Sequence, residues 1–152
     1  MAAGVPPASL LLLSPLVDLT LERAVARQAV ARTPDPFAVP AAALRMVAAY
    51  LADTDPRSPD VCLTDADLRG LPPTMLHVGS TEMLLDDARH LAERLTAAGV
   101  TTDLRVWRGQ LHVFPSLYRI VSHARAALAL SGSFLADTTD ETSHDHRRHP
   151  RD

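Results

Sequence analysis

Short apolar runs alternate along this chain with amphipathic stretches. Residues 8–13 form an apolar run between proline-containing segments, which is typical of a strand covered on both faces. Two further strands are predicted at 74–78 and 101–107. The last of these alternates apolar and polar side chains, which indicates one wetter face and a place at the edge of the sheet. Because continuously apolar strands are typical of parallel sheets, the pattern predicts an α/β fold with helices flanking a parallel sheet.

Helical spacing of apolar residues fills the intervals between these strands. The clearest predicted helix covers 83–98, where apolar side chains recur at steps of four, three and four, and it stops at Gly99, a common residue after a helix C-terminus. Further helices are expected at 21–32, at 40–52 and from Pro115 to about 135. The alternation of strand and helix is that of a layered α/β domain.

Two stretches lack such periodicity. Residues 53–71 are rich in proline and acidic residues, so we expect a loop, and loops of this length inside a compact domain are usually functional. After Asp137 the sequence contains no apolar residue. We therefore expect an α/β domain over 1–136 and a disordered polar tail over 137–152. Three tail histidines could hold a transition metal loosely, although such tails are more often solvated and inert: His144, His146 and His149.

Composition limits the classes of partner. A chain of 152 residues with 47% hydrophobic residues has the size of one domain with its own core. Its formal net charge of -3 comes from interspersed acids and bases, so there is no basic face for nucleic acid. Cys62 is the only cysteine, which favours a reducing compartment, and the apolar run near the start is too short to span a bilayer. We expect a cytoplasmic protein without a membrane span.

Two side chains suited to acid–base chemistry follow successive strands. Glu82 comes after the strand at 74–78, and His112 comes after the strand at 101–107. Because the carboxyl ends of parallel strands meet at one edge of the sheet, these groups are placed to form two members of a hydrolytic triad. Each also has a simpler explanation. Glu82 could be an acid in a first helical turn, favourable to the helix dipole, and His112 an ordinary loop histidine.

Four segments in order carry a more specific signal: residues 10–20, 67–73, 78–87 and 107–114. Together they resemble the C-terminal half of the hormone-sensitive-lipase-like family of α/β-hydrolases, over about residues 4 to 135. The resemblance implies hydrolysis of a small-molecule carboxylic ester through an acyl-enzyme, with no metal or organic cofactor.

The resemblance also implies roles for individual residues. Glu82 stands in the family's Gly-Ser/Thr-x-Asp/Glu setting, which implies the triad acid, and His112 stands in the His-Gly/Val-Phe turn, which implies the general base. The family more often has aspartate at the acid position, so Asp86 remains an alternative. Between the strands, the helix at 40–52 and the loop after it are expected to line the substrate pocket, with Met46, Tyr50 and Leu63 as the residues to test.

The family's nucleophile is not found in this sequence. Such enzymes carry it on a Gly-x-Ser-x-Gly elbow and build the oxyanion hole from a His-Gly-Gly-type loop. None of the serines has a glycine two residues before it, and no two glycines are adjacent. We therefore expect the C-terminal half of an α/β-hydrolase with the N-terminal half missing, inactive alone. Cys62 is a poor replacement nucleophile because it lies in the acidic loop.

Two alternatives remain open at this stage. The chain could be a non-catalytic remnant or a ligand- or protein-binding α/β module. The gibberellin receptors resemble the family and bind ligand after losing the triad histidine, whereas His112 is retained here. The chain could also be a free-standing domain in which the edge of the strand at 8–13 favours a homodimer or pairing with a missing N-terminal half.

Overall fold

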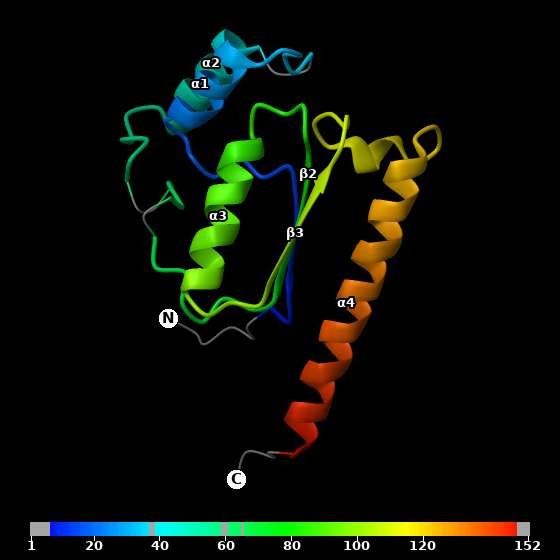
Figure 1. Ribbon diagram of the computed structural model, residues 1–152. Coiled ribbons are helices and arrows are strands. Elements are labelled where there is room, and N and C mark those ends of the chain that lie inside the picture. The colour runs from blue at the N-terminus through cyan, green and yellow to red at the C-terminus, as the bar shows by residue number, and fades with distance from the viewer. Residues whose placement is uncertain (1–6, 37–38, 59–60, 65, 149–152) are drawn as a thin grey trace.

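A computed structural model describes residues 7–36, 39–58, 61–64 and 66–148. Strands and helices alternate as the sequence pattern predicts (Figure 1). The elements in chain order are β1 (Leu10–Leu13), α1 (Glu22–Val30), α2 (Pro40–Leu51), β2 (Thr74–Gly79), α3 (Leu85–Ala97), β3 (Thr102–Trp107), a 3-10 helix (Phe114–Leu117) and α4 (Ser122–Arg148).

The three strands form one parallel sheet in the order β1-β2-β3. Leu12 pairs with Leu76, and Leu76 with Leu104, so the three leucines form a row across the sheet. β3 lies at an edge of this sheet, as its alternating sequence predicts. All three strands run in the same direction, so their carboxyl ends share one edge.

Helices cover both faces of the sheet (Figure 1). On one face the leucine row packs against α3 through Leu91 and Leu95, which are almost fully buried. On the other face α4 covers β2, where His77 bonds Ser131 of the helix. Burial of this apolar surface stabilises the packing of α3 on the sheet by about 25 cal/mol for each Å² removed from water.

Helices α1 and α2 lie beyond the carboxyl edge of the sheet, next to the N-terminal end of α3 (Figure 1). Their apolar side chains form one cluster with the two residues that directly precede α3. The buried members of this cluster are Leu21, Ala24, Val47, Leu51, Met83 and Leu84. This packing places the two helices beside the segment that follows β2.

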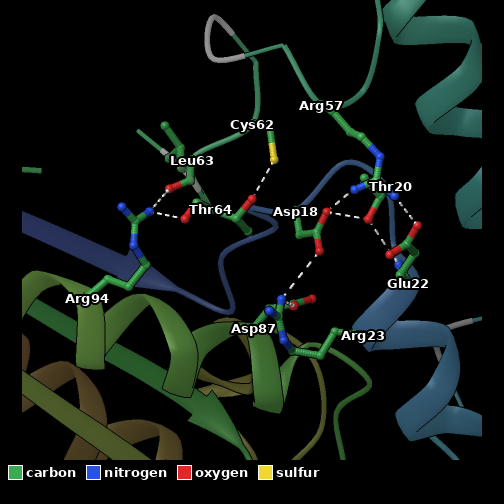
Figure 2. A network of polar contacts seen from close by, with 10 residues as sticks. All are labelled: Asp18, Thr20, Glu22, Arg23, Arg57, Cys62, Leu63, Thr64, Asp87 and Arg94. Carbon is green, nitrogen blue, oxygen red and sulfur yellow. Dashed lines mark hydrogen bonds and ion pairs between the residues drawn. The ribbon is translucent and has the colours of Figure 1, made fainter. Parts of the chain in front are cut away.

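The described part of the loop at 53–71 contains no helix or strand, as predicted, but arginines tie it to its neighbours (Figure 2). Arg57 pairs with Glu22 of α1. Arg94 of α3 donates to the backbone carbonyl oxygens of Leu63 and Thr64. The ion pair attaches the loop to α1, and the charged hydrogen-bond donor of Arg94 attaches it to α3.

The structure corrects two expectations for the C-terminal region. The helix expected from Pro115 is divided into a 3-10 helix and α4, which begins at Ser122. The disordered tail expected over 137–152 is also wrong for its first part, because α4 continues to Arg148. A lack of apolar residues does not prevent helix formation, and no glycine or proline interrupts the sequence between Asp137 and Pro150. Residues 149–152 lie outside the described residues.

Among the residues that the structure describes, no helix combines the length and the apolar character that crossing a membrane requires.

Candidate active site

Glu82 and His112 meet at the carboxyl edge of the sheet. Glu82 follows β2 by three residues, and His112 follows β3 by five, so two adjacent strands deliver them to the same place. His112 Nδ1 lies 2.9 Å from Glu82 Oε2. The predicted contact between the imidazole and the carboxylate is therefore confirmed.

The loops that carry the two residues touch at Gly79, the last residue of β2. A Cβ atom there would lie 2.1 Å from the backbone oxygen of Gln110, well inside van der Waals contact. On the other loop, Val113 follows His112 with φ of 47°, a left-handed conformation that is rare for a β-branched residue. The close approach and the left-handed turn together aim the imidazole back toward β2.

Glu82 is fully buried, and its carboxylate accepts from three donors. Ser14 Oγ donates to Oε1 at 2.7 Å, the backbone N–H of Gly79 donates to the same oxygen, and His112 Nδ1 donates to Oε2. A carboxylate can only accept, so Nδ1 carries the hydrogen. The neutral imidazole then presents its Nε2 lone pair as the acceptor for a proton.

Sequence reasoning missed Ser14, although a signal was present. Ser14 follows β1 directly, at the same edge of the sheet where the residues after β2 and β3 were sought. Its hydroxyl also accepts from the backbone N–H of Val113 at 3.0 Å. Ser14 thus connects β1 to the Glu82–His112 pair.

The environment makes His112 more basic than an ordinary histidine. The hydrogen bond to Glu82 is the main cause that raises the pKa of His112. Partial burial acts in the opposite direction, while the negative charges of Glu82 and Asp35 add to the increase. The carboxylates therefore stabilise the imidazolium that forms when His112 takes a proton.

The other acids near the start of α3 have different partners. Asp86 pairs with Arg27 at 3.1 Å and with Arg89 at 3.1 Å. Asp87 pairs with Arg23 at 2.9 Å, and burial raises the pKa of Asp87. The pairs with Arg27 and Arg23 hold α1 against α3, so the geometry favours Glu82 over Asp86 as the partner of His112.

A cavity of about 400 Å³ opens beside His112 and α2. Most of its lining is apolar, and the polar lining comes from Ser14, Asp35 and His112; the apolar lining residues are Leu16, Leu21, Val39, Ala42, Ala43, Met46, Met83 and Leu84. Of the three residues predicted for a pocket, Met46 lines this cavity. Tyr50 is 73% exposed instead, and the backbone carbonyl of Leu63 binds Arg94.

The remaining candidates from the sequence lie elsewhere. Cys62 is buried in the network of Figure 2, where its Sγ lies 2.9 Å from Thr64 Oγ1, and it borders a separate polar hollow with His90. In the described part of the chain, no three or more histidine, cysteine, aspartate or glutamate side chains are grouped so as to hold a metal ion. The tail histidines lie in a region whose side chains are outside the described residues.

Comparison with known proteins agrees with this fold. A family model described as alpha/beta hydrolase fold matches residues 1–116. An acetyl-hydrolase of Streptomyces hygroscopicus is 37% identical over 145 residues, which are 91% of this chain and 46% of that protein. The chain belongs to the α/β-hydrolases, and within them to the hormone-sensitive-lipase-like group.

Solved structures give the same result. The crystal structure of an esterase from the bacterial hormone-sensitive lipase family superposes with a TM-score of 0.83 at 36% identity, covering 90% of this chain and 45% of that one. Crystals of the protein EstE5 soaked with p-nitrophenyl butyrate give 0.80 at 33% identity, covering 89% and 45%. The predicted fold is thereby confirmed, and the chain spans about half the length of the relatives that it matches.

Proposed function

We propose that this chain carries the acid–base half of a serine carboxylic-ester hydrolase. The observation that carries the proposal is the 2.9 Å contact between His112 Nδ1 and Glu82 Oε2 beside an apolar cavity. In the reaction, a serine hydroxyl attacks the ester carbonyl while His112 Nε2 takes its proton. The imidazolium then returns that proton to the departing alcohol, and the acyl-enzyme is hydrolysed by water through the same relay.

Glu82 serves this relay in two ways. It fixes the tautomer, because a hydrogen held on Nδ1 leaves Nε2 as the base. It also stabilises the imidazolium, in agreement with the direction in which it moves the pKa of His112. Fully buried and hydrogen-bonded by Ser14 and Gly79, this carboxylate keeps one orientation through the proton transfers.

The cavity suggests the class of substrate. Its volume of about 400 Å³ falls in the range usual for small-molecule sites, and its wall is formed mainly by apolar side chains of α2 and of the segment before α3. An ester with an apolar acyl or alcohol group suits such a wall. Met46 lies on α2 at this wall, so its side chain should affect which ester is preferred.

The nucleophile and the oxyanion donors come, in this proposal, from a segment outside these 152 residues. No serine here has the glycine of a Gly-x-Ser-x-Gly elbow before it, and the relatives are about twice as long as the part matched. The chain alone should therefore not turn over p-nitrophenyl butyrate. Clear turnover that is lost in the variant His112→Ala would contradict this assignment of the nucleophile.

A chimera tests the roles of the residues directly. The chain is joined to the half of a hormone-sensitive-lipase-like esterase that it does not match, and kcat is measured with p-nitrophenyl butyrate. Glu82→Gln should lower kcat by about 10⁴-fold, the scale known for triad acids. Asp86→Asn is the matched control, since Asp86 is engaged with two arginines, and it should leave kcat nearly unchanged.

Two results would overturn the proposal. A large loss of kcat in Asp86→Asn, with Glu82→Gln active, would make Asp86 the triad acid. A folded chimera that binds the ester without hydrolysing it would favour a ligand-binding module in place of an enzyme.

A further inference from the structure

A closed ring of hydrogen bonds joins Ser14 to the Glu82–His112 pair. Ser14 Oγ donates to Glu82 Oε1 at 2.7 Å, and His112 Nδ1 donates to Oε2 at 2.9 Å. Val113, the residue after His112, donates its backbone N–H to Ser14 Oγ at 3.0 Å and so closes the ring. One hydroxyl thus contacts both the acid and the turn that holds the base.

The backbone of Ser14 is shaped to deliver this hydroxyl. Its N–H donates to the backbone oxygen of His77 at 2.8 Å and so continues the pairing of β1 with β2. Its φ of 50° then turns the chain sharply in a left-handed conformation, and the residue is 4% exposed. A non-glycine residue in that region is strained and persists where surrounding contacts fix it.

We propose that Ser14 is a positioning residue for the acid–base pair, acting through Glu82 and through the His112 turn. The terminal torsion of a glutamate side chain has a broad, shallow energy profile, so rotamer preference alone does not orient its carboxylate. Two donors on Oε1, the Ser14 hydroxyl and the Gly79 N–H, leave Oε2 directed at the imidazole.

The hydroxyl acts on the base as well as on the acid. The hydroxyl oxygen accepts a hydrogen bond from the backbone N–H of Val113, the residue that follows His112. Loss of the hydroxyl therefore loosens both sides of the Nδ1–H···Oε2 bond, which is the main cause of the raised pKa of His112. The catalytic importance of Ser14 rests on the proposed function, but its effect on His112 does not require turnover.

The experiment is an NMR titration of His112 in the 152-residue chain, with the ring nitrogen shifts reporting the tautomer. Ser14→Ala removes only the hydroxyl. Ser14→Gly removes it too, and glycine adopts a positive φ without strain, so this variant folds even where alanine is poorly tolerated. Ser80→Ala is the matched control, because the Ser80 hydroxyl accepts from the backbone N–H of Gly109 at 2.8 Å in the neighbouring turn.

In both Ser14 variants the apparent pKa of His112 should fall toward the ordinary value of about 6.5, with loss of a single Nδ1–H tautomer. The control should titrate as the unaltered chain does. An unchanged or increased pKa of His112 in folded Ser14→Gly would overturn the proposal. The outcome is independent of ester hydrolysis, so its failure is distinguishable from failure of the chimera to turn over substrate.

Discussion

Gly79 is the residue at which the loop carrying Glu82 touches the loop carrying His112. The backbone oxygen of Gln110 approaches it so closely that no side chain fits between them. The same oxygen accepts from the hydroxyl of Thr81 at 2.6 Å, which ties the loops together one step further on. The contact between acid and base therefore depends on a position where any Cβ atom is excluded.

Replacement of this glycine should destabilise the protein. In Gly79→Ala, the added methyl group would meet a backbone atom that cannot move away alone, so we expect a loss of about 1–3 kcal/mol in the free energy of unfolding. Urea denaturation followed by circular dichroism measures this loss.

Gly132→Ala is the control for that experiment. Gly132 lies within α4, and beyond its own stretch of helix no atom comes within 4 Å of the position that an alanine methyl group would take. Alanine there should therefore stabilise the helix by about 0.5–1 kcal/mol. Equal effects of the two substitutions would show that the close approach at Gly79 is not rigid.

Individual residues differed in how far the sequence revealed them. Glu82 and His112 were found because each follows a recognisable strand and matches a family motif. Ser14 also follows a strand directly, but it lies outside the two family motifs that imply triad residues and was missed. Asp35 was missed because its contact joins distant segments: it accepts from the backbone N–H of Met83 at 3.3 Å, across 48 positions of sequence. Such contacts follow from tertiary packing and leave no periodic signal in the chain.

At the scale of elements, Arg27 connects α1 to the turn before α3. Its guanidinium donates to the backbone oxygens of Glu82 at 2.8 Å and Ser80 at 3.0 Å, and it also pairs with Asp86. One planar group thus satisfies two carbonyls and a carboxylate. Helix α1 is thereby fixed to the segment that holds the proposed triad acid.

A lysine at this position should not replace the arginine. In Arg27→Lys, a single ammonium group cannot reach all three acceptors, so carbonyl oxygens lose their donor and the free energy of unfolding should fall by about 1–3 kcal/mol. Urea midpoints measure the change.

Arg89→Lys provides the comparison for Arg27. Arg89 pairs with the same carboxylate, that of Asp86, but its side chain is 51% exposed. Its replacement should change stability by no more than about 0.5 kcal/mol, as is usual for surface ion pairs. A loss as large as that in Arg27→Lys would show that the carboxylate, not the carbonyls, is what matters.

Most elements could be predicted from the spacing or the length of their apolar stretches. β2 is a short strand that is buried throughout and preceded by two prolines, α3 has buried positions at helical spacing, and both appear within two residues of the expected bounds. The C-terminal end of α4 could not be predicted in this way, because helix continuation past Asp137 depends on local propensity in a stretch without apolar residues. The break between the 3-10 helix and α4, before Ser122, also does not interrupt the spacing of apolar residues.

In the whole molecule, His77 in β2 and His112 in the loop after β3 respond to acid in opposite ways. His77 points under α4, where Trp107 Nε1 donates to its Nδ1 at 2.8 Å and its Nε2 lies 3.2 Å from Ser131 Oγ. Indole is only a donor, so Nδ1 must be unprotonated and the buried ring neutral. Burial accordingly lowers the pKa of His77.

These pKa shifts make opposite contributions to the pH dependence of stability. A histidine with a lowered pKa in the folded state, as His77 has, contributes stability that is present above the unfolded pKa of about 6.5 and is lost as the pH falls below it. A histidine with a raised pKa, as His112 has, contributes stability that is present below about 6.5 and is lost as the pH rises through the folded pKa. The two slopes partly cancel in the unaltered chain.

Substitution of each histidine should therefore tilt the pH profile in opposite directions. Between about pH 7.5 and 5.5, the free energy of unfolding of His77→Gln should decrease less on acidification than that of the unaltered chain. In the unaltered chain the histidine takes up a proton when it is unfolded but stays neutral when it is buried, which favours unfolding, and glutamine removes this effect. His112→Gln should decrease more, because the favourable imidazolium beside Glu82 is gone. Urea midpoints at three pH values measure these slopes. The other titrating groups, including Asp87, are common to the unaltered chain and the two variants, so their contributions cancel in the comparison. Parallel profiles, or slopes changed in the same direction, would show that one of the two rings does not occupy the environment described for it.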